Sequence, residues 1–329
     1  MGSCIFGDSV FKIVMRKIIW GISIGVLLAV AFETSDISPP FSSSVRIIFA
    51  GDIMLSRQIG RIMERQGDYN FPFELVAEKV RSADIAFGNL ENPVSDRGTN
   101  VGSIYSFRAD PQSLSGLKWA GFDVVSLANN HILDWGRDAF SDTLRHLSEA
   151  GIKGVGIGEN YGDAHKPARI KASRQGFCLF AYSEFASKAY IGDVSQTVAN
   201  IDKNQIFTDI DIAKGNNCDV VVVSLHWGNE YEIVPMEWQK ELAHTLIDNG
   251  ALLVIGHHPH VVQPVERYKD GIIAYSLGNF IFDQNFSEDT GKGIVLEVVI
   301  DDSKIKEVEE IKIKFNNKFQ PYIVGQSGV

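Results

Sequence analysis

The residues of this chain best suited to bind a metal ion follow the apolar run 251–255. They read Gly-His-His-Pro-His over positions 256–260, and the run before them is too short for a typical helix and typical of a buried strand. The glycine and the proline restrict the backbone, so that two imidazoles can point at one position. Because neutral imidazole is a common ligand of zinc, manganese and iron, we interpret His258 and His260 as candidate metal ligands.

The same arrangement, an apolar strand followed at once by polar side chains, occurs four more times. The runs 45–50, 84–87, 122–128 and 220–225 are followed by Gly51-Asp52-Ile53-Met54, Gly88-Asn89-Leu90-Glu91, Asn129-Asn130-His131 and His226-Trp227-Gly228. In open α/β sheets, ligands bind beyond the carboxyl ends of the strands. Strand exits that all deliver Asp, Asn, Glu or His therefore favour one shared metal site over a loop that is rich in histidine by chance.

This set of carboxylate, amide and imidazole groups suits one or two divalent ions of manganese, zinc or iron. Two ions about 3.5–4 Å apart could activate a water molecule for attack on a phosphorus or a carbonyl centre. A histidine beside the ligands could then protonate the leaving group. His131 follows the candidate ligand Asn130 directly and is our candidate for this general acid.

Six motifs in this order resemble the CapA family of poly-γ-glutamate capsule biosynthesis proteins, a branch of the calcineurin-like metallophosphoesterases. They are Gly-Asp-Ile-Met-Leu at 51–55, Gly-Asn-Leu-Glu at 88–91, Asn-Asn-His at 129–131, His-Trp-Gly at 226–228, Gly-His-His-Pro-His at 256–260 and Ser-Leu-Gly-Asn-Phe at 276–280. The resemblance covers residues 45 to 282. It implies an α/β fold, a four-layer αββα sandwich of two mixed sheets, with a dinuclear metal site between the sheets.

Carried over residue by residue, the resemblance implies six metal ligands and two catalytic residues. The ligands are Asp52, Glu91, Asn130, His226, His258 and His260, and the catalytic residues are Asp52 and His131. Two positions depart from the superfamily pattern: Met54 stands where a histidine is usual, and Asn89 stands where the bridging aspartate is usual. We favour Glu91 as the bridge, because an amide lacks the negative charge that a bridging position needs, and His257 is then a neighbour of the ligands.

The resemblance points to poly-γ-glutamate as the substrate, in its assembly, export or cleavage. Arg108 could bind a carboxylate or phosphate of the substrate, although a surface ion pair explains it nearly as well. Asn279 and Asp283 could line the site or cap a turn. The departures leave two alternatives open: a phosphomonoesterase or phosphodiesterase, and a non-catalytic, membrane-tethered subunit of a polymer synthase that contacts other capsule-synthesis membrane proteins.

Composition excludes some classes of function. The chain has 329 residues, of which 45% are hydrophobic and 22% are charged, as in ordinary globular proteins. Its net charge of −10 and the absence of a basic stripe argue against a nucleic-acid partner. Cys178 and Cys218 lie in or beside apolar strands, and we interpret them as buried thiols rather than as a disulfide framework.

The first 32 residues are typical of a signal peptide or a membrane anchor. Lys12, Arg16 and Lys17 precede the uncharged run 18–32, and the segment 33–44 with its prolines and serines is typical of a linker. We therefore expect the basic residues to stay inside, the run to enter the membrane, and the domain 45–329 to lie outside the cytoplasm, either membrane-anchored or secreted.

The elements that must position these side chains alternate between strands and helices. Helical patterns cover 57–66, 73–81, 113–120, 137–150, 208–217 and 236–249. Late in the chain, 293–300 and 305–315 predict a hairpin with a turn at Asp301-Asp302. The pattern favours a mixed sheet whose parallel strands end at the proposed site.

Overall fold

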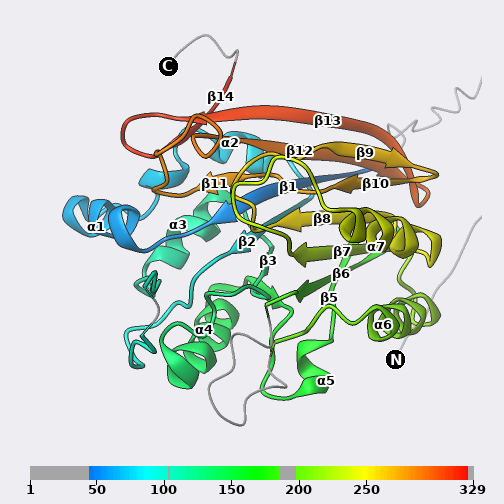
Figure 1. Cartoon of the computed structure of the whole chain (residues 1–329), viewed down its shortest axis with the longest axis horizontal. Coiled ribbons are helices and arrows are strands. Elements are labelled where there is room, and N and C mark those ends of the chain that lie inside the picture. The colour runs from blue at the N-terminus through cyan, green and yellow to red at the C-terminus, as the bar shows by residue number, and fades with distance from the viewer. Residues whose placement is uncertain (1–43, 103, 186–197, 325–329) are drawn as a thin grey trace, which may run out of the picture. The chain divides into compact units, whose positions relative to one another are not determined.

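A computed structural model describes residues 44–102, 104–185 and 198–324 of the chain (Figure 1). The predicted signal or anchor segment, 1–32, and nearly all of the predicted linker lie outside the described residues. The fold below belongs to the compact unit Ser42–Val329. Within the described residues, no helix has both the length and the apolar character needed to cross a membrane.

Two mixed sheets form the centre of this unit, as the resemblance implied. The first has the strand order β14-β13-β12-β1-β2-β3-β4, with β11 paired to β1, and the second has the order β5-β6-β7-β8-β10-β9. The strands of the first sheet are β1 (Val45–Ile53), β2 (Ile85–Leu90), β3 (Val124–Ser126), β4 (Lys153–Val155), β11 (Asn279–Ile281), β12 (Lys292–Asp301), β13 (Lys304–Phe315) and β14 (Pro321–Ile323). Those of the second are β5 (Ala168–Ala172), β6 (Gln175–Ser183), β7 (Val220–His226), β8 (Leu253–His257), β9 (Val265–Tyr268) and β10 (Gly271–Ala274).

Parallel strands occupy the middle of both sheets, and antiparallel strands extend them. In the first sheet β1, β2, β3 and β4 run parallel, and β12 is antiparallel to β1. In the second sheet β6, β7, β8 and β10 run parallel, with β5 and β9 antiparallel at the edges. The carboxyl ends of β1 and β2, and of β7 and β8, are therefore side by side within their sheets.

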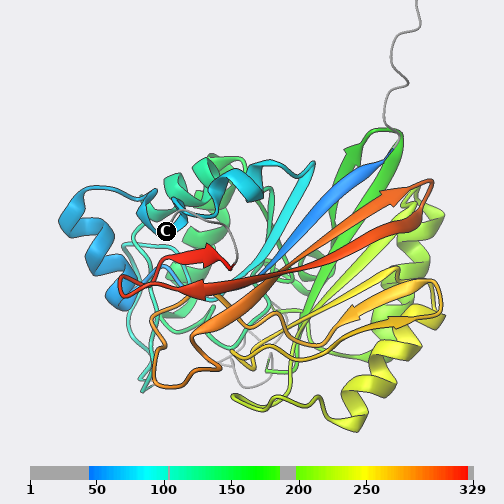
Figure 2. The same cartoon turned by 90° about the horizontal axis from the view of Figure 1, so that it is seen from above.

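Helices cover the outer faces of the sheets. They are α1 (Arg57–Gln66), α2 (Ala77–Arg81), α3 (Ser113–Ala120), α4 (Gly136–Ala150), α5 (Tyr161–Ala164), α6 (Lys203–Gly215) and α7 (Glu237–Asp248), with a 3₁₀ turn, η1, at Phe71–Phe73. Figures 1 and 2 show α6 and α7 beside the second sheet and α1, α3 and α4 beside the first. This is the four-layer αββα arrangement.

Strand β6 shows why the sheets pack in this way. Its residues alternate between two cores: Phe177 and Leu179 face the first sheet, whereas Phe180 and Tyr182 join the core under α6 and α7. Successive side chains of a strand point to opposite faces, so a strand that is apolar at every position must be covered on both sides. The continuous apolar runs of the sequence thus dictate the layers.

The predicted elements agree with the observed ones where the local signals are strong. Helices α1 and α3 have the predicted bounds, and the late hairpin is confirmed, with Asp301 paired to Lys304 across the turn. Helix α6 begins at Lys203, five residues before the predicted start, because the Asp202 side chain accepts hydrogen bonds from the backbone N–H groups of Asn204 and Gln205. The prediction of a helix over 73–81 is wrong in its first part, since η1 and a non-helical segment precede α2.

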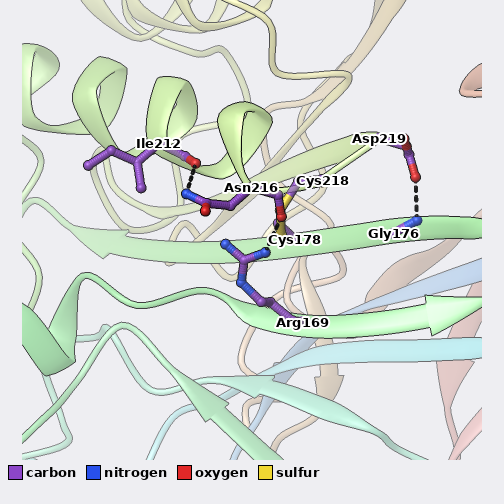
Figure 3. The surroundings of a disulfide bond; sticks show 7 residues. All are labelled: Arg169, Gly176, Cys178, Ile212, Asn216, Cys218 and Asp219. Carbon is purple, nitrogen blue, oxygen red and sulfur yellow. Dashed lines mark hydrogen bonds between the residues drawn. A yellow bond between two sulfur atoms is a disulfide. The ribbon is translucent and has the colours of Figure 1, made fainter.

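The interpretation of Cys178 and Cys218 as buried thiols is wrong, because the two form a disulfide (Figure 3). Their Cα atoms lie 5.7 Å apart, within the usual range for such a bond. Cys178 lies in β6, and Cys218 lies between α6 and the neighbouring strand β7, so the pairing of β6 with β7 brings them together. A sequence separation of 40 residues gave no local signal for this contact.

Candidate metal centre

The carboxyl ends of four central strands bring the predicted ligands together from both sheets. Asp52 lies at the end of β1, and the parallel pairing aligns it with Asn89 of β2. Glu91 follows β2 directly. In the second sheet, His226 ends β7 and is aligned with His257, the last residue of β8. The site therefore combines residues of both sheets.

Two overlapping groups of side chains could each hold a divalent ion. One consists of Glu91, His258 and His260, and the other of Asp52, Glu91 and His226; in each group the ligand atoms lie within 4.8 Å of one another. We call these five residues the metal cluster, and all five are buried. Because Glu91 belongs to both groups, the geometry suits the bridging position for which the sequence favours it.

The histidines that follow β8 reach this position through an unusual backbone. His258 and His260 have φ angles of +100° and +57°, a region that residues other than glycine rarely adopt. Such strain persists only where the surrounding structure enforces it, and it concentrates at functional sites. The His260 ring is further held by Asn279 Oδ1, which lies 3.0 Å from its Nδ1 atom.

Asn89 acts as a hydrogen-bond donor between the two carboxylates. Its Nδ2 atom donates to Asp52 Oδ1 at 2.9 Å and to Glu91 Oε2 at 3.1 Å. Asn130, a predicted ligand, places its Oδ1 atom 2.9 Å from Nε2 of His226 and thus contacts the cluster through that imidazole. Asn129, which the sequence analysis did not single out, donates to the Leu90 carbonyl oxygen at 2.9 Å and stabilises the turn that presents Glu91.

The buried polar atoms of the cluster fit a bound cation. Among the described residues, Glu91 Oε1 has no hydrogen-bond donor, although His260 Nε2 lies 3.5 Å from it. Within that same part of the chain both ring nitrogens of His257 also lack hydrogen bonds, and its Nδ1 atom lies 3.4 Å from Asp52 Oδ1. A buried carboxylate oxygen without a donor is costly in a protein, and a divalent cation is the partner that this set of donors would best accommodate.

The pKa values of the cluster depart strongly from their usual ranges. Burial raises the pKa of Glu91 well above that of an ordinary glutamate, and the negative charge of Asp52 adds to the effect. Burial also acts to raise the pKa of Asp52, but the imidazoles of His257 and His260 outweigh it and hold the value well below the usual range. For His226, burial lowers the pKa well below that of a free imidazole, and His258 reinforces this. Neutral imidazoles are the form that binds metal.

His131, the candidate general acid, lies beside the cluster with its ring fixed on two sides. Its Nδ1 atom is 2.8 Å from Asp134 Oδ2, and its ring stacks on Phe107 with centroids 4.0 Å apart. Its other nitrogen, Nε2, lies 3.9 Å from Glu91 Oε1. Asp134 therefore orients His131, a role that the sequence analysis missed although the aspartate follows the histidine by only three residues.

The remaining predicted residues occupy different surroundings. Asn279 is buried against His260 and also donates to the Thr290 carbonyl oxygen at 3.1 Å. The Arg108 guanidinium lies 3.6 Å from the centroid of the Trp135 ring and donates to the Arg97 carbonyl oxygen. A role for either residue in substrate binding stays a prediction.

Two residues near the cluster were not found from the sequence. Tyr231 has a φ angle of +67°, and its ring centroid lies 6.3 Å from that of His260. Burial and the neighbouring Glu230 raise its pKa, which keeps the hydroxyl protonated. Arg57 lies over the Phe107 ring. Both residues lie outside the regular apolar patterns that guided the analysis, Tyr231 in a loop and Arg57 at the start of a helix.

Met54, which replaces the usual histidine of the first motif, is fully buried. Its sulfur accepts hydrogen bonds from the backbone N–H and the hydroxyl of Ser56, at 3.2 and 3.0 Å. At this position the chain therefore packs a thioether against the turn that leads into α1, in place of the imidazole of the superfamily pattern.

Solved structures with a similar fold place the protein in a class. A hypothetical protein from Thermus thermophilus has a TM-score of 0.53 and 17% identity, covering 82% of this chain and 99% of its own. A 5'-nucleotidase precursor from the same organism has a TM-score of 0.50 and 11% identity, covering 85% of this chain and 56% of its own. The class that these structures define is one of fold, and in this chain the strand ends bring together a buried cluster of side chains that could hold a metal ion.

Sequence comparison identifies the family within this class. Residues 46–284 match the family described as bacterial capsule synthesis protein PGA_cap, and the chain belongs to that family. It is 34% identical to the "Capsule biosynthesis protein CapA" of Bacillus anthracis over 77% of this chain, and 31% identical to the "PGA biosynthesis protein CapA" of Bacillus subtilis (strain 168) over 75%. The matches span 64% and 66% of those relatives, a little under two thirds of their length.

Proposed function

We propose that this protein is a metal-dependent hydrolase of capsule polymer synthesis, which acts on poly-γ-glutamate outside the cytoplasm. The observation that carries the proposal is Glu91, a buried carboxylate shared by two metal-type groups, one of whose oxygens finds no hydrogen-bond donor within the described residues. Support for the substrate comes from membership of the PGA_cap family and from the name of the Bacillus subtilis relative.

In this proposal, some residues would bind the metal ions and the substrate, and others would transfer a proton. Divalent ions held by the metal cluster would supply an activated water nucleophile and positive charge toward the anionic polymer. Asp134 holds the Nδ1 side of His131, so that Nε2 faces the cluster and can deliver a proton to the leaving group. Tyr231, whose hydroxyl stays protonated, lies near His260 and could donate a hydrogen bond to the substrate.

Metal analysis of the full chain tests the metal cluster. We expect the purified wild type to contain a divalent ion and the His258→Ala/His260→Ala double variant to lose it. The matched control is His146→Ala/His244→Ala, because these histidines lie beside Glu149 and Glu266, outside the cluster. A wild type without metal, or equal metal content in all three proteins, would contradict the proposal.

Parallel assays of two substrates test the reaction. Poly-γ-glutamate and a generic aryl phosphate would be incubated with the metal-loaded protein, and release of γ-glutamyl fragments or of phosphate would be followed. We expect cleavage of the polymer. Turnover of the phosphate ester alone would favour a phosphomonoesterase or phosphodiesterase, the alternative that the fold suggests.

The disulfide supports the proposed location of the domain. Structural disulfides form mainly in oxidising compartments and are rare in the bacterial cytoplasm. The bond between Cys178 and Cys218 thus fits a body that folds after export, whether it is then anchored or secreted. Protease added to intact cells should digest the domain, and peptide mapping without reductant should recover the two cysteines as one linked pair. Protection from protease, with the protein in the cytosol, would contradict export.

A second function is favoured by Met54, which removes one ligand from the superfamily pattern. On this view the protein is a non-catalytic, membrane-tethered subunit of a polymer synthase, held with other capsule-synthesis membrane proteins. Complementation distinguishes the two: an Asp52→Asn/His131→Ala variant should fail to restore normal polymer if the protein is a hydrolase. Full restoration by a folded variant would favour the assembly subunit.

A further inference from the structure

Arg57 and His131, the candidate general acid, both contact the ring of Phe107. It is the first residue of α1, after the turn that leaves β1 and Asp52. Its guanidinium carbon is 5.4 Å from the centroid of the Phe107 ring, the same ring that stacks on His131. The Phe107 backbone N–H donates to Asp134 Oδ2 at 2.8 Å. Asp134 therefore contacts both His131 and the backbone of Phe107, the residue whose ring lies beside the Arg57 guanidinium.

A second contact joins Arg57 to Asp283, which lies just after β11, the strand that pairs in parallel with the end of β1. Its Nη2 atom lies 3.1 Å from Oδ1 of Asp283, whose other oxygen accepts a hydrogen bond from the backbone N–H of Gln58. Asp283 follows Phe282, whose ring centroid is 4.7 Å from that of His260. The Arg57 side chain remains 35% exposed. The guanidinium is thus anchored through one nitrogen and retains further N–H donors for a ligand.

The backbone of Arg57 is also strained. Its φ angle is +52°, in the left-handed region that residues other than glycine rarely adopt. Three of the other non-glycine residues with positive φ border or belong to the metal cluster: Tyr231, His258 and His260. Strained residues concentrate where a side chain must be held in a working position. Arg57 shares this property with residues of the site, although no metal-type pattern marks it in the sequence.

The acidic residues around Glu91 favour a positively charged group near the site. Asp52, Glu230 and Asp134 contribute negative charge around Glu91, in a chain whose net charge is −10. An anionic substrate that approached these groups would be repelled unless positive charge faced it, and bound metal ions would supply only part of this charge. The guanidinium of Arg57 lies beside the ring that contacts the general acid, whereas that of Arg108 lies over Trp135.

We propose that Arg57 binds an anionic group of the substrate, a carboxylate of the γ-glutamyl polymer, next to the bond at which His131 acts. This inference rests on the function proposed above. The planar guanidinium can bind a carboxylate through two parallel hydrogen bonds, which would fix the position of the neighbouring unit of the polymer. Arg57 is then a substrate-binding residue that the sequence analysis did not name.

Steady-state kinetics and calorimetric binding with the metal-loaded full chain test this inference. The variants are Arg57→Gln, Arg57→Lys, Arg57→Gly and Arg108→Gln. Arg57→Gly relieves the left-handed strain, so that loss of binding can be separated from loss of folding. The matched control is Arg65→Gln, which removes one positive charge from the same helix about 12 Å further along its axis, at about 1.5 Å per residue.

We expect Arg57→Gln and Arg57→Gly to raise KM and Kd for poly-γ-glutamate about tenfold or more, with a smaller change in kcat and unchanged metal content. Arg57→Lys should restore part of the binding, because it keeps the charge and loses the planar fork. Arg65→Gln should leave KM and its salt dependence unchanged. An increase of KM in Arg108→Gln, with none in the Arg57 variants, would overturn the inference and leave the proposed hydrolase intact.

Other results separate the inference from the proposed function. If the wild type binds the polymer without cleaving it, and Arg57→Gln weakens that binding, the role of Arg57 stands and the hydrolase fails. If the wild type hydrolyses only the aryl phosphate, and Arg57→Gln raises KM for that ester, Arg57 binds the substrate anion and the polymer assignment fails. A wild type that binds neither anion would overturn both.

Discussion

Two buried clusters of histidine and carboxylate in this fold differ in how far their polar atoms are satisfied. One is the metal cluster at the ends of β1, β2, β7 and β8. The other, which we call the Asp209 network, lies on the outer side of the second sheet under α6 and consists of His165, Tyr182, Gln205 and Asp209. In the Asp209 network, Oδ2 faces His165 Nδ1 and the Tyr182 hydroxyl at 2.8 Å each, and Oδ1 accepts from Gln205 at 2.9 Å.

The metal cluster has the opposite character. Two carboxylates, Asp52 and Glu91, lie close together, and Glu91 Oε1 has no hydrogen-bond donor in the described part of the chain. Fully connected buried networks rigidify a core, whereas incompletely satisfied ones destabilise it unless a ligand completes them. The comparison indicates that the Asp209 network stabilises the fold and that the metal cluster is arranged for a bound cation. The presence of histidine does not by itself distinguish the metal cluster from the Asp209 network.

Replacing one histidine in each region should give the largest difference between the metal cluster and the Asp209 network. In His131→Ala we expect kcat on poly-γ-glutamate to fall by about 10²–10⁴-fold, because the leaving group would lose its proton donor. Metal content and thermal stability should change little. The measurement is steady-state cleavage by the metal-loaded protein.

The control for that experiment is His165→Ala, which removes a histidine of the Asp209 network. It should reduce stability and leave kcat close to that of the wild type. Asp134→Asn should give an intermediate loss of kcat, since it disturbs the orientation of His131 and leaves the imidazole in place. Equal losses of activity in His131→Ala and His165→Ala would mean that both act through folding alone.

The disulfide beside the Asp209 network should contribute more to stability than any other single contact of that region. We expect the Cys178→Ser/Cys218→Ser variant to lose about 2–4 kcal/mol of unfolding free energy, from the entropy of the loop that the bond closes. Urea denaturation of the oxidised wild type and of the variant would measure the difference. A variant as stable as the wild type would contradict the expected stabilisation by the disulfide.

Removal of the acceptor from the Asp209 network should have a smaller effect. In Asp209→Ala, the buried donors of His165 and Tyr182 and the half-buried donor of Gln205 would lose their common partner, and we expect a loss of about 1–3 kcal/mol. The metal-loaded variant should keep its kcat at temperatures below its unfolding transition. A fall in kcat without a fall in stability would show that this network belongs to the active site after all.

The pH dependence of the unfolding free energy of the metal-free protein should reveal the cost of burying the charged Glu91 carboxylate. Because burial and Asp52 raise its pKa, the folded state binds a proton there more tightly than the unfolded chain. The contribution of Glu91 to the unfolding free energy should therefore decrease as pH rises from the ordinary glutamate range through the raised value. Asp52, with its lowered pKa, acts at more acidic pH. His226, whose pKa is also lowered, adds stability as pH rises toward the ordinary imidazole range, so the contribution of Glu91 is the difference between the wild type and Glu91→Gln.

Chelator-treated wild type and Glu91→Gln would be unfolded in urea between about pH 5 and pH 8 to test this. The decrease should be weaker in Glu91→Gln, and added divalent ions should abolish it in the wild type. An identical pH profile in both proteins would mean that Glu91 does not cause the pH dependence.

Much of the fold and of the candidate site could be predicted from the sequence, because both follow from local patterns. Apolar runs that end in Asp, Asn, Glu or His predicted the strand ends, and glycine stops such as Gly151 predicted the ends of helices. These signals lie within a few residues of one another. The proximity of Asp52 and Glu91 followed because parallel strands end at the same edge of a sheet.

The tertiary structure alone decided which residues outside those patterns meet the site. Asp134, Tyr231 and Arg57 lie on loops or at a helix start, and Arg57 meets the surroundings of the site through the Phe107 ring and through Asp283. The same holds for the disulfide, whose cysteines are 40 residues apart and meet because β6 pairs with β7. Contacts between distant segments depend on how whole layers pack, and no short stretch of sequence encodes that packing.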